Sequence, residues 1–146
     1  MQIVNRKAKF NYELLDRIEV GIVLSGAEVK SVKAGHLSFS DAFVKFIGSE
    51  LWLVNMMISP YAFAQNENYD PKQSRKLLLH KQELLALTKK METGNLTLVP
   101  TVIYTKGRRV KLEIALARGR KTFEKKEVLK RRDLDREAAK TLRGVK

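Results

Sequence analysis

The 146-residue chain contains no cysteine, 3 prolines and a single tryptophan. Without cysteine it can form neither a disulfide framework nor a thiolate metal site, and such a composition is typical of a reducing compartment. No apolar run approaches the roughly 20 residues that a membrane-spanning helix requires, and the N-terminus lacks the apolar core of a signal peptide. We therefore expect a cytoplasmic protein that does not bind membranes.

Acidic residues are scarce, because the chain has 16 Asp and Glu against 29 Lys and Arg, a formal net charge of +13. This excess is larger than solubility alone asks of a small domain, and it predicts a polyanionic partner such as a nucleic acid. Residues 118–146 contain 12 basic and 5 acidic side chains. Just over half of the excess positive charge therefore lies in the last fifth of the chain.

Motifs for catalysis are missing too. Neither His36 nor His80 has a metal-ligand or nucleophile motif around it, and no phosphate-binding glycine loop is present. Four carboxylates could converge on Mg²⁺, as in a nuclease, but their spacing carries no specific signal. They are Asp16, Glu19, Asp41 and Asp70. We expect a protein that is not an enzyme and that holds no metal and no cofactor.

What is present is mostly a β pattern. Val110, Leu112 and Ile114 alternate with charged residues after a Lys-Gly-Arg turn, which predicts a hairpin over residues 97–117. The other expected elements are a hairpin over residues 42–54, a strand over 10–24 and short helices over 25–35 and 81–93. Residues 1–117 are therefore predicted to form a mainly β fold, a small closed antiparallel barrel resembling an OB fold, because closure removes exposed edges.

Two basic segments of this expected barrel could contact RNA phosphates. Residues 5–9 form a basic N-terminal arm, which is either a solvated chain end or a phosphate clamp. Arg75 and Lys76 stand where a polar loop enters the next element, where they either grip phosphate or are solvated. The residues alone leave both alternatives open.

The basic tail, residues 118–146, interleaves apolar and basic residues and so allows a helix. An isolated helix of about 15 residues is marginal in water. We therefore expect the tail to be disordered until it binds a partner. Phe123 in this tail either stacks on an rRNA base or anchors the tail to the barrel.

Short motifs in order along the chain resemble those of the SsrA-binding protein family, also called small protein B. They lie at residues 5–8, 21–24, 26–31, 58–61, 70–71, 75–80, 97–100 and 116–121. The resemblance implies a Greek-key barrel similar to an OB fold, with three helices. It also implies a protein that binds the tRNA-like domain of transfer-messenger RNA and delivers this RNA to stalled ribosomes for trans-translation.

The resemblance further implies that the tail contacts the ribosome. In that family the barrel stands in for a missing anticodon arm, while the tail enters the vacant mRNA channel near the decoding region. The implied partners are thus transfer-messenger RNA and the ribosome with its rRNA, and we expect the protein to act as a monomer. Where the family commonly has Asp-Lys-Arg, this chain has Glu124, Lys125 and Lys126, which keep the charges but lose the guanidinium fork.

Individual site residues follow from the matching motifs. Glu28, Leu78 and His80 match family positions implicated in RNA binding, and Glu28 would either accept hydrogen bonds from base amino groups or orient Lys30. The full set expected to bind RNA in the barrel is Asn5, Arg6, Lys7, Glu28, Lys30, Arg75, Lys76, Leu78 and His80. The set expected to bind the ribosome in the tail is Arg118, Arg120, Lys121, Phe123, Glu124, Lys125, Lys126, Lys130, Arg131 and Arg132.

Two alternative functions stay open on the residues alone. One is a general OB-like RNA-binding protein of the ribosome or its assembly, which would show no preference for a tRNA-like RNA. The other is a metal-dependent nuclease, which would degrade RNA when Mg²⁺ is added. Neither explains the ordered set of motifs as well as the family resemblance does.

Overall fold

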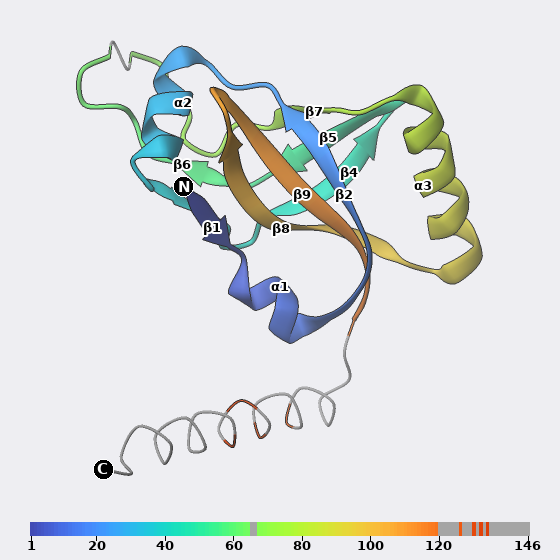
Figure 1. The fold of residues 1–146 in the computed structure, drawn as a ribbon. Coiled ribbons are helices and arrows are strands. Elements are labelled where there is room, and N and C mark those ends of the chain that lie inside the picture. Colours follow the sequence, from blue (N-terminus) through green and yellow to red (C-terminus); the bar gives the residue numbers. More distant parts are fainter. Residues whose placement is uncertain (65–66, 120–125, 127–129, 131, 133, 135–146) are drawn as a thin grey trace.

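The computed structural model describes residues 1–64, 67–119, 126, 130, 132 and 134. Within these residues the fold is mainly β, with a seven-stranded antiparallel sheet, a two-stranded sheet and three helices (Figure 1). The strands are β1 (Gln2–Val4), β2 (Tyr12–Ile22), β3 (Leu37–Ser38), β4 (Phe43–Ile47), β5 (Glu50–Val54), β6 (Met57–Ile58), β7 (Arg75–Leu78), β8 (Thr97–Lys106) and β9 (Arg109–Gly119). The helices are α1 (Arg6–Asn11), α2 (Gly26–Lys33) and α3 (Lys81–Gly94). The large sheet has the order β1-β8-β9-β2-β7-β5-β4, and β3 pairs with β6.

The main predicted hairpin is confirmed as β8 and β9. Lys106 pairs with Arg109 across a turn in which Gly107 has φ 63°, a left-handed conformation that glycine adopts without a steric penalty. The predicted apolar face of β9 is buried, but the opposite face is covered as well near the end of the strand. There Ala117 packs against Ala8 of α1. The strand is therefore buried on both faces at the end from which the tail leaves.

The N-terminal segment, predicted as a basic arm, is instead ordered. β1 pairs with β8, and α1 begins after Asn5, whose Oδ1 accepts a hydrogen bond from the Ala8 N–H at 3.3 Å. Asn5 also holds an irregular part of β8, because its backbone N–H donates to Thr101 O at 2.7 Å and its side-chain amide donates to Pro100 O at 2.8 Å. The predicted strand over residues 10–24 accordingly begins later, after α1 ends.

The closed barrel is not found, because no described strand pair joins the two edges of the sheet, β1 and β4. The sheet curls enough for β4 to approach β8. However, the outer edge of β8 is already paired with β1 from Val102 to Tyr104, and Pro100 has no N–H to donate to a further strand. The fold is thus an antiparallel sheet that is curled and open within the described residues.

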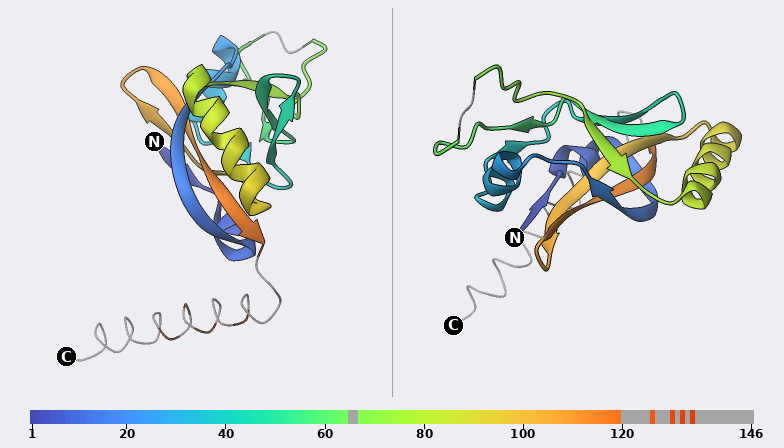
Figure 2. Two further views of the ribbon diagram at one scale, coloured as in Figure 1. Left: turned by 90° about the vertical axis from the view of Figure 1, so that its right-hand side faces the viewer. Right: turned by 90° about the horizontal axis from the view of Figure 1, so that it is seen from above.

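Both predicted helices that flank this sheet are confirmed. Ser25 caps α2 in a capping box with Glu28, which satisfies two backbone N–H groups at the start of the helix. Asn95, with φ 49°, ends α3. The helix α3 lies along one side of the curled sheet (Figure 2) and buries Leu87 in the core.

Candidate nucleic-acid interface

An exposed leucine lies in a surface hollow together with His80, another residue expected to bind RNA. Leu77 and Leu78 are consecutive in β7, so their side chains point to opposite faces of the sheet. Leu77 is in the core, whereas 51% of Leu78 is exposed. Leu78 lines a hollow of about 370 Å³, which we call the Leu78 hollow. Its lining residues are Glu19, Gly21, Leu78, Leu79, His80, Glu83 and Lys111.

A glycine determines how deeply Leu78 can sit in this hollow. Gly21 of β2 pairs with Leu78 across the ladder. A Cβ atom at position 21 would lie 3.2 Å from Leu78 Cβ, closer than ordinary van der Waals contact. The missing side chain of Gly21 therefore leaves the space that Leu78 occupies.

Two acidic residues, Glu83 and Glu19, line the hollow, and the resemblance identified neither of them. The Glu83 carboxylate accepts a hydrogen bond from the His80 backbone N–H. The other acidic residue is Glu19 of β2. The Tyr104 hydroxyl donates a hydrogen bond to its carboxylate, and Lys106 Nζ lies 3.5 Å from Glu19 Oε1. The Tyr104 hydrogen bond is the main cause that lowers the pKa of Glu19, and the charges of Lys106 and Lys111 lower it further. Burial, followed by the hydrogen bond to Glu19, raises the pKa of Tyr104 to about 12. Glu19 is thus an ionised acceptor at neutral pH.

Cationic side chains border the Leu78 hollow. Lys111 lines it directly, and a second hollow of about 310 Å³ adjoins it and shares Gly21, Leu78 and Lys111. Arg108 and Arg109, exposed at the turn of the main hairpin, line this second hollow. In the sequence, the only sign that Arg108 and Arg109 could contact RNA is a group of basic side chains in a tight turn. Only the fold brings that turn beside Leu78.

Glu28 and Arg75, both expected to contact RNA, lie instead in the interior. Their side chains are 3% and 1% exposed, and Arg75 Nη2 lies 2.7 Å from Glu28 Oε2. Tyr69 Oη is 3.0 Å from the same carboxylate oxygen, and Gln73 Nε2 donates to it at 3.3 Å. We call these four residues the Glu28 cluster. The charged groups of Glu28 and Arg75 are paired inside the cluster, and neither is exposed to a ligand.

The Glu28 cluster also binds the two ends of the loop between β6 and β7. Arg75 donates to the carbonyl oxygens of Met56 and Pro71, and Tyr69 Oη is 2.9 Å from Ile58 O. Burial opposes ionisation of Glu28, but the hydrogen bonds from the Ser25 backbone, Arg75 and Tyr69 outweigh it and lower the pKa of Glu28. The ionised carboxylate therefore fixes the position of the loop.

The other residues expected to bind RNA are spread over the domain. His80 is exposed at the start of α3, with Leu78, in the same hollow. Lys76 is paired with Glu50 at 3.2 Å, and Lys30 is exposed on α2. Arg6 and Lys7 are exposed on α1, at the opposite end of β2 from β7 (Figure 1), whereas Asn5 is buried at the cap of α1.

Most of the tail lies outside the described residues. Arg120, Lys121, Phe123, Glu124, Lys125 and Arg131 are among those that the structure does not describe, and the expectation of a tail disordered until it binds concerns the same segment. Lys126, Lys130 and Arg132 are exposed. Arg118, at the end of β9, lies with its Nη2 atom 2.6 Å from Glu13 Oε2.

The described part of the chain contains neither a metal-binding cluster nor a membrane-spanning helix. No group of three or more His, Cys, Asp or Glu side chains is placed there to hold a metal ion. Within the same residues, no helix is long and apolar enough to cross a membrane.

Known proteins similar to this chain share most of its length. A family model described as "SmpB protein" matches residues 2–144. The SsrA-binding protein of Solidesulfovibrio magneticus is 47% identical over 139 residues, covering 95% of this chain and 90% of that protein. The SsrA-binding protein of Malacoplasma penetrans is 45% identical over 141 residues, covering 97% of each. A chain of a solved structure described as "tmRNA-SmpB: a journey to the center of the bacterial ribosome" is 46% identical, with a TM-score of 0.68, covering 83% of this chain and 85% of that one.

Proposed function

Because the chain belongs to the SmpB protein family, we propose that it binds transfer-messenger RNA and delivers it to stalled ribosomes in trans-translation. The observation that carries the proposal in the structure is the Leu78 hollow, where an exposed apolar side chain lies among carboxylate acceptors and Lys111, with Arg108 and Arg109 in the adjoining hollow. Structured RNA is recognised mainly by its shape, its backbone and its unstacked bases. The hollow offers a contact for each of these.

We assign the contacts by chemistry. Leu78 packs against an unstacked base or a ribose, and Lys111, Arg108 and Arg109 neutralise phosphates beside it. Glu19 accepts hydrogen bonds from base amino groups, the role that the resemblance had suggested for Glu28. His80 offers a hydrogen bond from the rim.

For Glu28 and Arg75 we propose a positioning role. Both side chains are buried and paired, so neither reaches an RNA ligand without unfolding the Glu28 cluster. Their hydrogen bonds hold the loop between β6 and β7 against α2. Loss of either side chain would thus disturb RNA binding through the loop.

We also propose that the two parts of the chain bind different partners. Residues 1–117 would bind the RNA, and residues 118–146 would contact rRNA near the decoding region and the mRNA channel through their basic clusters. On this proposal the protein works where ribosomes translate, in the cytoplasm, as a monomeric binding protein and not as an enzyme. The high share of positive charge in residues 118–146 supports the second part.

The test is binding to transfer-messenger RNA and to an unrelated structured RNA of equal length, each over a salt series. We expect a preference for transfer-messenger RNA that persists at high salt, because shaped contacts do not depend on counterion release. Leu78→Ala should weaken that binding by roughly 10-fold. The matched control is Leu85→Ala, since Leu85 is 55% exposed on α3 and does not line the hollow. Equal binding of both RNAs at every salt concentration would favour a general ribosomal RNA-binding protein.

The role of the tail is tested by a chain that ends at Arg118. We expect its affinity for transfer-messenger RNA to be largely unchanged and its activity in a trans-translation assay to be abolished, because the ribosome contacts are lost. Tagging at the level of the full chain would contradict the proposed role of residues 119–146.

A further inference from the structure

The most exposed large apolar side chain of the described residues is an aromatic one outside the Leu78 hollow. Phe63, in the loop between β6 and β7, is 87% exposed. A phenylalanine side chain this exposed contributes little free energy of burial to the isolated domain. Its exposure therefore points to a ligand that covers it.

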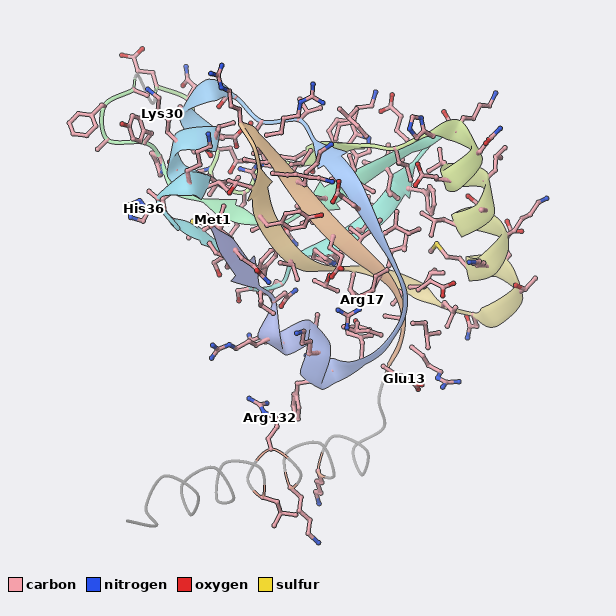
Figure 3. The ribbon with its side chains drawn as sticks, viewed as in Figure 1. Met1, Glu13, Arg17, Lys30, His36 and Arg132 are labelled. Carbon is pink, nitrogen blue, oxygen red and sulfur yellow. The ribbon has the colours of Figure 1, made fainter. Side chains whose placement is uncertain are left out.

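Phe63 does not stand alone. The rings of Tyr61 and Phe63 meet edge to face, with centroids 5.5 Å apart and an interplanar angle of 67°. Lys30 Nζ, from α2, lies 5.4 Å from the centroid of the Tyr61 ring, within the range of a cation–π interaction. Figure 3 shows Lys30 on α2 beside this loop. We call Lys30, Tyr61 and Phe63 the aromatic platform.

The loop that carries the platform is fixed at its base. Its two ends are held to Glu28 and Arg75 through Ile58, Tyr69 and Pro71. The same Glu28 forms the capping box of α2, the helix that carries Lys30. One cluster thus anchors both the loop that carries the aromatic rings and the helix that carries the ammonium group. Such preorganisation lowers the entropic penalty of binding a ligand.

We propose that the aromatic platform stacks an unpaired RNA base on Phe63, with Lys30 neutralising the adjacent phosphate. Aromatic rings interleaved with cations are the general means by which proteins hold unstacked bases without reading their sequence. The charge is suitable, because Lys33 lies one turn from Lys30 on the exposed side of α2 and the chain has a net charge of +13. The proposal rests on the proposed function only for its choice of RNA as ligand.

The platform is a second contact region, separate from the Leu78 hollow, and α2 connects it to the second hollow that adjoins the Leu78 hollow. Val29 lines the hollow that holds Arg108 and Arg109, while the next residue, Lys30, belongs to the platform. Successive residues of an α-helix point about 100° apart around its axis. One RNA that crosses α2 could therefore contact both regions, or each region could hold a different RNA.

Three substitutions at Phe63 in the full chain test the proposal. Phe63→Ala should weaken binding of the RNA that uses the platform by roughly 5- to 100-fold, because stacking on that base is lost. Phe63→Trp should bind at least as well as the natural chain. Phe63→Leu, which keeps apolar area without a π face, should behave like Phe63→Ala. Stability should not change, since Phe63 is exposed.

Two binding experiments, the arms of the test, identify the RNA that supplies the base. One arm measures affinity for transfer-messenger RNA and the other measures affinity for the isolated small ribosomal subunit, each over a salt series. The salt slope should be unchanged in Phe63→Ala and shallower in Lys30→Ala, because only the latter removes a phosphate contact. The matched control is Phe43→Ala, since Phe43 is 41% exposed on β4 and belongs to neither region.

The outcomes separate the platform from the proposed function. A loss in either arm for Phe63→Ala and Phe63→Leu, restored by Phe63→Trp, supports the platform even if the natural chain shows no preference for transfer-messenger RNA. Unchanged affinity of Phe63→Ala in both arms overturns the platform, even if that preference is found. Retained affinity of Phe63→Leu would also overturn it, because an apolar contact would then suffice.

Discussion

The Glu28 cluster and the Glu19 carboxylate that lines the Leu78 hollow each combine a carboxylate with a tyrosine and a cation, in opposite surroundings. Glu28 and Arg75 are buried and Tyr69 is half-buried, whereas Glu19 and Lys106 lie at the surface with side chains 38% and 68% exposed. In the interior every partner is another part of the chain. At the surface the carboxylate keeps acceptor capacity for a ligand.

The difference shows that residue type does not distinguish a scaffold from a contact surface. A buried charge must have its partners inside the protein, because an unpaired one would lose its hydration without compensation. A solvent-exposed pair contributes little to stability and can be rearranged when a ligand arrives. Substitutions at Glu28 or Arg75 should accordingly lower the stability of the fold first, whereas substitutions in the hollow should lower the affinity for RNA.

The largest effect is expected from breaking the buried pair. Arg75→Met leaves the Glu28 carboxylate buried without its cation, so the free energy of unfolding should fall by about 3–5 kcal/mol, measured by urea denaturation. Adding Glu28→Gln should recover part of the loss, because the uncompensated charge is then removed.

The control for this prediction is the neighbouring residue. Lys76→Met removes a cation of the same strand whose ion pair with Glu50 is exposed, so its effect should stay within about 0.5 kcal/mol. Equal effects at positions 75 and 76 would contradict the distinction between the two regions.

A smaller effect is expected in the hollow from Gly21→Ala. The added Cβ meets Leu78 Cβ at 3.2 Å, so Leu78 must shift by a few tenths of an ångström. Affinity for transfer-messenger RNA should fall by roughly 3- to 10-fold, about 1 kcal/mol. Gly26→Ala is the control, because no atom lies within 4 Å of a Cβ there. Unchanged affinity of Gly21→Ala would mean that the position of Leu78 does not matter for the RNA.

The smallest effect is expected when the pH is lowered. The pKa of Glu28 is lowered by folding, so its ionised form contributes stability above the usual value of 4.5, and this contribution is lost as the pH falls through the lowered pKa. The difference in unfolding free energy between the natural chain and Glu28→Gln should therefore be largest at neutral pH and shrink on acidification. A constant difference from pH 7 to pH 3 would contradict a coupled, ionised Glu28.

Local patterns were sufficient to predict much of the fold. The two hairpins and the helices α2 and α3 follow from alternation, turn residues and caps that lie within a few residues of each other. The helix α1 could not be found in this way, because its cap Asn5 is held by Pro100 and Thr101, some 95 residues later. The open edge of the sheet likewise depends on where β1 pairs, which no local signal specifies.

The candidate site was predictable only in part. The motif match indicated Leu78 and His80, which the fold does bring together. The motif match also indicated Glu28, and the position of Arg75 at the end of a polar loop indicated Arg75. The burial of both depends on a contact between residues 47 positions apart. Glu19 and Lys111 were missed, because each lies on a different strand and only the sheet order places them beside β7.

The strand β9 also acts as a spacer of fixed length. Its 11 residues, Arg109–Gly119, span about 35 Å at the usual rise of a strand, starting at the turn beside the Leu78 hollow. It is paired with β8 on one side and β2 on the other, so it cannot shorten without breaking both ladders. If the proposed RNA contact at the hollow is correct, the length of β9 sets the distance from that contact to the point where the chain leaves the sheet.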